Sequence, residues 1–260
     1  MYLKSADAEI YYEVQGSGPD LVLIHPFPAN HGIWGPVAVM LSTRYRVILP
    51  DVRGLGRSSP GDGPATMEKH AEDLRRLIDE LGLTKAAFGG NSIGGYILFE
   101  FWRRFRERVS ALILVDTRAG ADSDSARKTR LEAADDVLNR GTEPFIGAQV
   151  PRLLGESTQS NRPDKVAEAK RMMMQASASG IAAVQRGMAE RPDSNATLGS
   201  ISVPTLVMAG EEDTLTTPLE METMHRSIRG SIFRRIPKAG HYSPFEQPDE
   251  VHRVIRDFLA

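Results

Sequence analysis

Short apolar runs recur along this chain, and longer segments with a different spacing of apolar residues lie between them. A short run that is apolar throughout is typical of a strand buried on both faces, as in a parallel sheet covered by helices. The chain contains such runs at residues 21–24, 47–49, 86–88, 111–115 and 204–209. We predict a strand at each of them, and we read residues 1–25 as two or three strands in all.

The segments between these runs predict helices. Within residues 66–81 the apolar positions are three or four apart, the spacing of one helix face, at Met67, Ala71, Leu74, Ile78 and Leu81. Residues 93–105 form a second candidate helix. Strands that alternate with helices predict a mainly parallel sheet covered on both faces. From about 117 to 201 the alternation stops and the pattern is helical, so we expect several helices inserted between two strands.

Composition narrows the class of protein. A chain of 260 residues suits one large α/β domain, or a core with a modest insertion. The formal net charge of −2 gives no reason to expect a nucleic acid or an anionic membrane as a partner. The absence of cysteine excludes disulfides, thiolate catalysis and cysteine-ligated metals. Neither a signal-peptide pattern nor an apolar stretch approaching the roughly 20 residues that span a bilayer is found, so we expect a soluble cytoplasmic protein.

A candidate nucleophile lies between the third of these runs and the helix that follows it. Residues 90–94 read Gly-Asn-Ser-Ile-Gly, which matches the G-x-S-x-G pattern of a nucleophile elbow. In such an elbow Ser92 sits on a tight, strained turn, and larger side chains at Gly90 and Gly94 would collide with neighbouring chain. The turn also directs the Ile93 N–H towards a developing oxyanion. The alternative is that Ser92 only caps the helix after a glycine-rich turn.

A serine nucleophile requires a base, and the base requires a carboxylate that orients it. In an elbow fold the acid and then the histidine follow the serine along the chain. Of the histidines that follow Ser92, His225 lies in a helical segment and His252 in the amphipathic terminal helix. His241 lies in a loop between a short strand and that helix, from which it can reach over the edge of the sheet. We therefore predict His241 as the base, the alternative being a surface histidine.

Three carboxylates follow the last buried run. Asp213 is the best placed of them, and we read Glu211 and Glu212 as solvated. Asp116, at the end of an earlier strand, is the rival position for the acid. We predict that Asp213 orients His241 and stabilises its cation.

The oxyanion of a tetrahedral intermediate needs a second N–H donor from the loop after an early strand. The loop that follows the first buried run occupies that place. Pro26 and Pro28 have no N–H, so Phe27 is the first donor available there. We predict that the N–H groups of Phe27 and Ile93 form the oxyanion hole, and that His25 is a buried structural residue.

Taken together, these motifs resemble the α/β-hydrolase fold family. Residues 50–59 look like the family's D-x-R-G-x-G-x-S loop, in which Asp51 and Arg53 would be structural. Residues 210–213 look like its acid-bearing turn, and residues 240–248 are similar to its catalytic histidine segment. The resemblance covers nearly the whole chain outside the helical insertion.

The resemblance implies an α/β fold with a mostly parallel sheet of the eight-stranded type and helices on both faces. A core of residues 1–117 and 201–260 would carry a helical cap formed by residues 118–200. One position departs from the family, which usually has His-Gly before the oxyanion donor where this chain has His25-Pro26. Proline restricts the backbone but leaves the N–H of the next residue in place, so catalysis is still expected.

Within the family, residues 99–122 look most like 3-oxoadipate enol-lactonases and related esterases. We therefore predict a carboxylesterase or lactonase in which Ser92, His241 and Asp213 cleave a small-molecule ester or lactone through an acyl-enzyme. No metal and no organic cofactor is needed for this chemistry. A turn like that at residues 90–92 also occurs among carbon–carbon bond hydrolases, so cleavage of a diketone is one alternative. A hydrolase-like receptor for a small ligand is another, and the oligomeric state stays open.

The substrate pocket is expected between the edge of the sheet and the helical insertion. Trp34, Asn30, His31 and Met173 are the candidates for contact with the substrate. Aromatic and methionine side chains at such spacings also occur in a plain core, which is the alternative for Trp34 and Met173.

Overall fold

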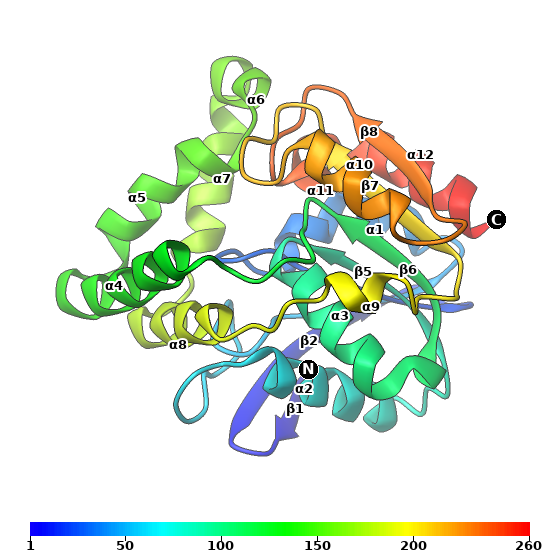
Figure 1. Ribbon diagram of the computed structural model, residues 1–260, viewed down its shortest axis with the longest axis horizontal. Coiled ribbons are helices and arrows are strands. Elements are labelled where there is room, and N and C mark those ends of the chain that lie inside the picture. The colour runs from blue at the N-terminus through cyan, green and yellow to red at the C-terminus, as the bar shows by residue number, and fades with distance from the viewer.

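Eight strands form one sheet in the computed structural model, which describes residues 1–260 (Figure 1). Their order across the sheet is β1-β2-β4-β3-β5-β6-β7-β8. The two pairs that involve β2 are antiparallel, and every other pair is parallel. The expected α/β fold with a mostly parallel sheet is confirmed. The strands are β1 (Tyr2–Ser5), β2 (Ala8–Gln15), β3 (Asp20–Ile24), β4 (Arg46–Pro50), β5 (Ala86–Asn91), β6 (Val109–Val115), β7 (Thr205–Gly210) and β8 (Ile232–Ile236).

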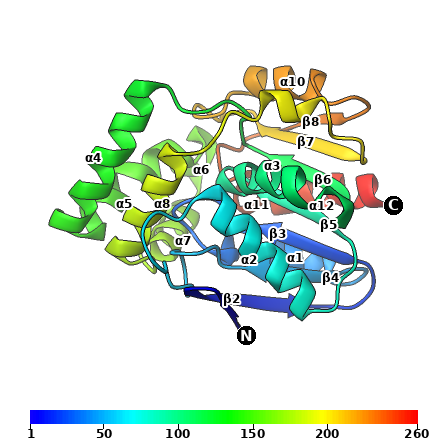
Figure 2. The same cartoon turned by 60° about the horizontal axis from the view of Figure 1, so that its bottom comes forward.

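The central strands contribute to two hydrophobic cores, one on each face of the sheet. Leu21 and Leu23 of β3 belong to one core, whereas Val22 and Ile24 belong to the other. The first core is covered by α1 (Gly35–Leu41) and α12 (Pro248–Leu259), and the second by α2 (Met67–Glu80), α3 (Ile93–Phe105) and α10 (Pro218–Arg226). Figure 2 shows α2 and α3 in front of the sheet and α12 behind it. Burial on both faces explains why these strands read as continuous apolar runs.

The strands predicted from apolar runs are present as β3 to β7, and the helices predicted between them at 66–81 and 93–105 are α2 and α3. The helical segments predicted around His225 and His252 are α10 and α12. The sequence did not predict the 3-10 turn η1 (His31–Trp34) or the helix α1 that follows it. Both are short, and the residues at the start of α1, Gly35-Pro36, resemble a turn. Proline is tolerated in the first turn of a helix because its missing N–H would have no acceptor within the helix.

Six helices lie between β6 and β7: α4 (Asp124–Arg140), α5 (Thr142–Leu153), α6 (Glu156–Asn161), α7 (Pro163–Met173), α8 (Ala178–Ala189) and α9 (Asn195–Leu198). The first five form a layer beside the sheet, whereas α9 lies close to α3 (Figure 1). Arg103 of α3 donates hydrogen bonds to the side chains of Ser194 and Thr197, at 2.8 and 3.1 Å. The last part of the insertion, expected at 118–200, therefore joins the helices that cover the sheet. No helix in the fold has both the length and the apolar character that a membrane crossing requires.

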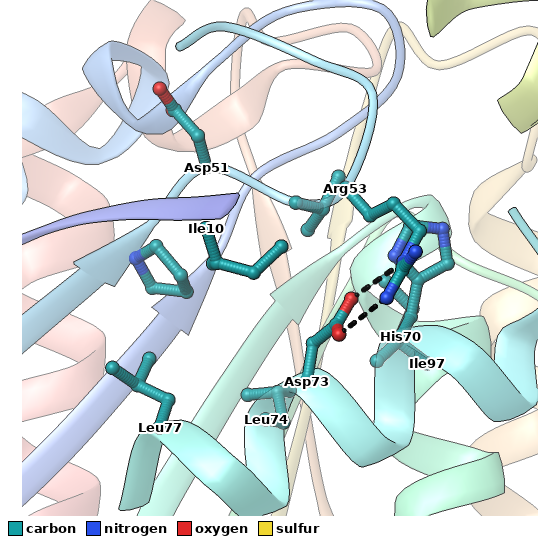
Figure 3. Close-up of a pocket in the computed structure, with 10 residues that line it drawn as sticks. Ile10, Asp51, Arg53, His70, Asp73, Leu74, Leu77 and Ile97 are labelled. Carbon is teal, nitrogen blue, oxygen red and sulfur yellow. Dashed lines mark hydrogen bonds and ion pairs between the residues drawn. The ribbon is translucent and has the colours of Figure 1, made fainter. Parts of the chain in front are cut away.

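A buried ion pair and a buried histidine lie beneath the loop that follows β4. The Arg53 guanidinium, 2 % exposed, donates two hydrogen bonds to Asp73 of α2, at 2.9 and 2.8 Å (Figure 3). Its Nη1 donates to Asp7 at 2.6 Å. His70 lines a cavity of about 20 Å³ beside this pair, and its Nε2 has no hydrogen-bond partner in the protein. Arg53 thus links the start of the chain to α2, which is a structural role.

The His70 imidazole makes the stability of the fold depend on pH. Burial, reinforced by the positive charge of Arg53, lowers the pKa of His70 from its usual 6.5 to about 3. Between these values the unfolded chain binds a proton that the folded protein does not, so the free energy of unfolding falls as the pH drops from 6.5 towards 3. We expect the wild-type protein to lose about 2–3 kcal/mol more than His70→Gln between about pH 7.5 and pH 4.5. Urea unfolding of both proteins at the two pH values measures this, and equal losses would contradict a buried neutral imidazole.

Candidate active site

Ser92 occupies a sharp turn between β5 and α3. Its backbone has φ 56° and ψ −114°, a region that non-glycine residues rarely enter and that costs on the order of 1–3 kcal/mol. The neighbouring chain holds the turn, because the Ser92 N–H donates to the Val115 carbonyl at 2.9 Å and the Thr117 hydroxyl donates to the Ser92 carbonyl at 2.7 Å. A Cβ atom at Gly90 would overlap the backbone of Gly94. Glycine at position 90 is therefore required by the geometry of the turn.

Three side chains that are far apart in the sequence meet at the carboxyl edge of the sheet. His241 lies between β8 and α11 (Ser243–Glu246), and its Nε2 is 2.7 Å from the Oγ of Ser92. The Nδ1 of His241 is 2.8 Å from Oδ2 of Asp213, which follows β7. A carboxylate beside Nδ1 keeps the proton on that nitrogen, so Nε2 is free to accept the proton of the serine hydroxyl.

The Asp213 carboxylate is held by its own turn. Its Oδ1 accepts the N–H groups of Leu215 at 2.8 Å and Thr216 at 3.0 Å, and its Oδ2 accepts the Thr216 hydroxyl at 2.5 Å. Burial raises the pKa of Asp213, but the charge of His241 and these hydrogen bonds lower the pKa further, so that it lies below its usual value. Asp213 is therefore ionised at neutral pH. The sequence did not single out Thr216, although a threonine three residues after an aspartate is one pattern for a local side-chain hydrogen bond.

Asp116, the rival acid, is buried behind these three residues. Its Oδ1 accepts the Gly210 N–H at 2.7 Å and its Oδ2 accepts the Ser243 hydroxyl at 2.6 Å. Burial and the negative charge of Asp213 raise the pKa of Asp116 well above its usual range. Asp116 joins the end of β7 to the segment that carries His241, but it is Asp213 that contacts the imidazole.

The loop after β3 lies beside the Ser92 turn. The His25 ring is fully buried, bonds to its own loop through Nδ1, and accepts the Val52 N–H through Nε2 at 2.9 Å. This is the structural arrangement expected for His25. The Phe27 carbonyl accepts the Tyr242 hydroxyl at 2.9 Å, while the Phe27 N–H donates to no acceptor in the protein. Phe27 lines the same cavity as Ser92.

A cavity of about 350 Å³ lies between the edge of the sheet and the inserted helices. This is where the sequence placed the pocket. On the sheet side and in the adjoining loops it is lined by Phe27, Ser92, Tyr96, Arg118, Asp122, Thr214, Leu215, Thr216 and His241. From α4, α5 and α8 it is lined by Ala126, Arg130, Gln149, Arg152, Leu153, Gln185 and Met188. The sequence identified no lining residue on the inserted helices correctly.

The two apolar candidates for substrate contact, Trp34 and Met173, lie outside this cavity. Trp34 is fully buried in the core beneath α1 and α12, and its Nε1 donates to the Ile24 carbonyl at 3.0 Å. Met173, at the end of α7, is also fully buried. Both predictions of substrate contact were wrong, because an apolar pattern identifies a buried residue without telling a packed core from the wall of a cavity.

The two polar candidates hold loops in place instead of lining the cavity. The Asn30 side chain accepts the Gly32 N–H at 2.9 Å and donates to Gln175 at 3.0 Å. The Nδ1 of His31 is 2.7 Å from the buried carboxylate of Asp51, and His31 does not line the cavity. These two predictions were wrong as well, whereas Asp51 is structural, as the resemblance implied.

A buried carboxylate ties the inserted helices to the segment that carries the histidine. Glu246 is 4 % exposed, and it accepts the Gly240 N–H at 2.9 Å through one oxygen and the Gly155 N–H at 2.8 Å through the other. The His241 N–H donates to the Leu153 carbonyl at 3.0 Å. The turn between α5 and α6 therefore fixes the backbone on both sides of the imidazole.

The remaining candidates lie outside the site. Glu212, which the sequence indicated as solvated, accepts the Ser157 N–H at 2.8 Å and so ties the acid-bearing turn to α6, while Glu211 is exposed. His225 lies on α10 and its Nδ1 is 2.6 Å from the hydroxyl of Ser231, just before β8, and His252 lies on α12. Neither histidine lines the cavity.

Replacing Glu246 should weaken the tie between α6 and the histidine segment. Glutamine keeps one acceptor oxygen but turns an NH2 group towards a backbone N–H, and an unsatisfied buried donor costs about 1–3 kcal/mol. We expect Glu246→Gln to lower the free energy of unfolding by about that amount in urea titrations. The exposed Glu168→Gln on α7 is the matched control, with an expected change below about 0.5 kcal/mol. Equal stability of the two variants would contradict the tie.

Known proteins resemble the chain over its whole length. A sequence model of the α/β hydrolase fold family matches residues 19–248. A thermophilic esterase from Thermogutta terrifontis, solved with malate bound, is 41 % identical with a TM-score of 0.97, and the match covers 100 % of this chain and 98 % of that one. The enol-lactonase from Burkholderia xenovorans LB400 is 26 % identical with a TM-score of 0.93, and the match covers 100 % of this chain and 99 % of that one. The 3-oxoadipate enol-lactonase 1 of Acinetobacter baylyi is 28 % identical over 95 % of this chain and 92 % of its own length.

Proposed function

The chain belongs to the α/β-hydrolase fold family, and we propose that it hydrolyses a carboxylic ester or lactone with Ser92 as the nucleophile. One observation carries the proposal: an unbroken series of short hydrogen bonds runs from Asp213 through His241 to the Ser92 hydroxyl. The esterase and enol-lactonase names of similar proteins support this class of substrate. A cavity of about 350 Å³ suits a small molecule.

In the proposed reaction, the Oγ of Ser92 adds to the carbonyl carbon while Nε2 of His241 takes the hydroxyl proton. The carbonyl electrons move to oxygen, and the N–H groups of Phe27 and Ile93 bind the resulting oxyanion. As the intermediate collapses, the bond to the leaving alkoxide breaks and His241 gives that oxygen its proton. Water then adds to the acyl-enzyme and gives a proton to His241. Ser92 leaves with that proton, and the carboxylic acid is released.

The charge of Asp213 supports the role of His241 in this scheme. When the imidazole takes a proton it becomes a buried cation, which the adjacent carboxylate stabilises. The lowered pKa of Asp213 means that this negative charge is present throughout the neutral pH range. The Thr216 hydroxyl donates to the same carboxylate oxygen and so restrains its position.

Ser92→Ala should abolish turnover. We expect the kcat for 4-nitrophenyl acetate to fall by about 10⁴-fold or more, because the attacking oxygen is lost. The exposed Ser160→Ala on α6 is the control and should keep wild-type activity. Circular dichroism and the melting temperature check that both variants fold. Turnover of an ester, an enol-lactone and a diketone that is cleaved at a carbon–carbon bond identifies the substrate class. Retained ester turnover by Ser92→Ala would contradict the proposal.

Asp213 and Asp116 should differ sharply in their effect on catalysis. In Asp213→Asn no carboxylate holds the proton on Nδ1 of His241. The imidazole can then carry its proton on Nε2 and cannot accept the serine proton there, so we expect kcat/KM to fall by about 10⁴-fold. Asp116→Asn removes a carboxyl that does not touch the imidazole, and its loss should be at least about 100-fold smaller. Steady-state kinetics of the two variants measure the difference. The opposite order of losses would assign the acid to Asp116.

A further inference from the structure

We infer that the substrate carries a carboxylate and that Arg152 and Arg118 are the specificity-determining residues that bind it. This inference rests on the proposed hydrolysis at Ser92. Three arginines and one aspartate line the cavity over Ser92, and no lysine or glutamate does. Only 6 of its 16 lining residues are hydrophobic, whereas a pocket for a neutral, apolar ester would be mainly apolar. The excess of positive charge therefore indicates an anionic ligand.

The third arginine, Arg130, already has a partner. Its Nε is 2.5 Å from Oδ2 of Asp122, and the same carboxylate contacts Nη1 of Arg191 at 2.7 Å. The Nη1 of Arg130 also donates to Gln185 at 3.1 Å. Two guanidinium groups thus share the only carboxylate among the lining residues. No lining carboxylate is left to neutralise Arg118 and Arg152.

Arg152 is free and well placed. Its guanidinium forms no ion pair or hydrogen bond within the protein, although it lines the cavity. It lies in the last turn of α5, next to Leu153, whose carbonyl accepts the His241 N–H at 3.0 Å. The backbone of Arg152 is therefore fixed relative to the proposed catalytic residues. A guanidinium presents paired N–H groups that match the two oxygens of a carboxylate.

Arg118 also lines the cavity, from the segment that follows β6. Its Nη2 donates to the Leu215 carbonyl, but its buried Nε has no hydrogen-bond partner. The one carboxylate within ion-pair distance, that of Glu220, is 3.7 Å from Nη2. That Nε is closed off from the cavity, but Nη1 is not buried and donates to no acceptor in the protein. A substrate carboxylate held between Arg118 and Arg152 would accept charge-assisted hydrogen bonds from the unpaired N–H groups of both side chains.

Two chromogenic esters of equal chain length test the inference. The 4-nitrophenyl monoester of glutarate has a carboxylate where 4-nitrophenyl valerate has a methyl group. We expect the wild-type protein to prefer the glutarate ester in kcat/KM. Arg152→Gln and Arg118→Gln should each lower the glutarate-to-valerate ratio about tenfold or more, mainly through KM, because a charge-assisted hydrogen bond is lost. Arg152→Lys, which keeps the charge, should restore part of the ratio.

The matched control is Arg171→Gln, which removes an exposed arginine of α7 that does not line the cavity and should leave the ratio unchanged. Melting temperatures check that the variants fold. Arg152 is exposed, so Arg152→Gln should fold normally and keeps the test decisive if Arg118→Gln is unstable. A wild-type ratio near one that Arg152→Gln does not move would overturn the inference and leave ester hydrolysis standing. Failure of the wild-type protein to cleave either ester would overturn the proposed function, and the inference with it.

Discussion

The turn at Ser92 constrains everything around it, because a non-glycine residue with φ of 56° persists only where its surroundings allow no alternative. Three adjacent strands provide those surroundings. β5 leads into the turn, β6 ends at Val115, whose carbonyl accepts the Ser92 N–H, and β3 ends at Ile24, against which Gly94 packs closely. The sheet order places β3 and β6 on either side of β5. The strained residue is therefore supported from both sides by rigid elements, which a turn at the edge of the sheet would lack.

Buried carboxylates fix the loops that surround this turn. Asp51, Asp116 and Glu246 are almost fully buried, and each accepts backbone N–H groups from two separate segments. Loops lack the regular partners of helices and strands, so their N–H groups need other acceptors. A buried carboxylate is equally in need of donors. Each meets the requirement of the other, and the loops at the carboxyl edge are held by these hydrogen bonds.

Much of this arrangement could be predicted from the sequence, because the signals were local. Continuous apolar runs indicated the central strands, and G-x-S-x-G with the later Asp213 and His241 indicated which side chains would meet. Predictions that depended on tertiary packing were wrong. Trp34 and Met173 are buried, as apolar residues should be, but they lie within cores. Arg152 had no signal at all, because an exposed arginine at a helix end is normally solvated and only the position of α5 over the sheet makes it line a cavity.

The turn between α5 and α6 contacts both the segment that carries His241 and the wall of the cavity. Through Leu153 and Gly155 it holds the segment that carries His241, and through the preceding Arg152 it reaches the cavity. A movement of α5 would therefore shift the imidazole and the guanidinium together. A cap attached only by flexible hinges could change its contacts with a ligand without disturbing the residues beneath it. Here the alignment of His241 with Ser92 depends on the same few residues that shape the wall of the cavity, so the inserted helices are part of the site rather than a cover over it.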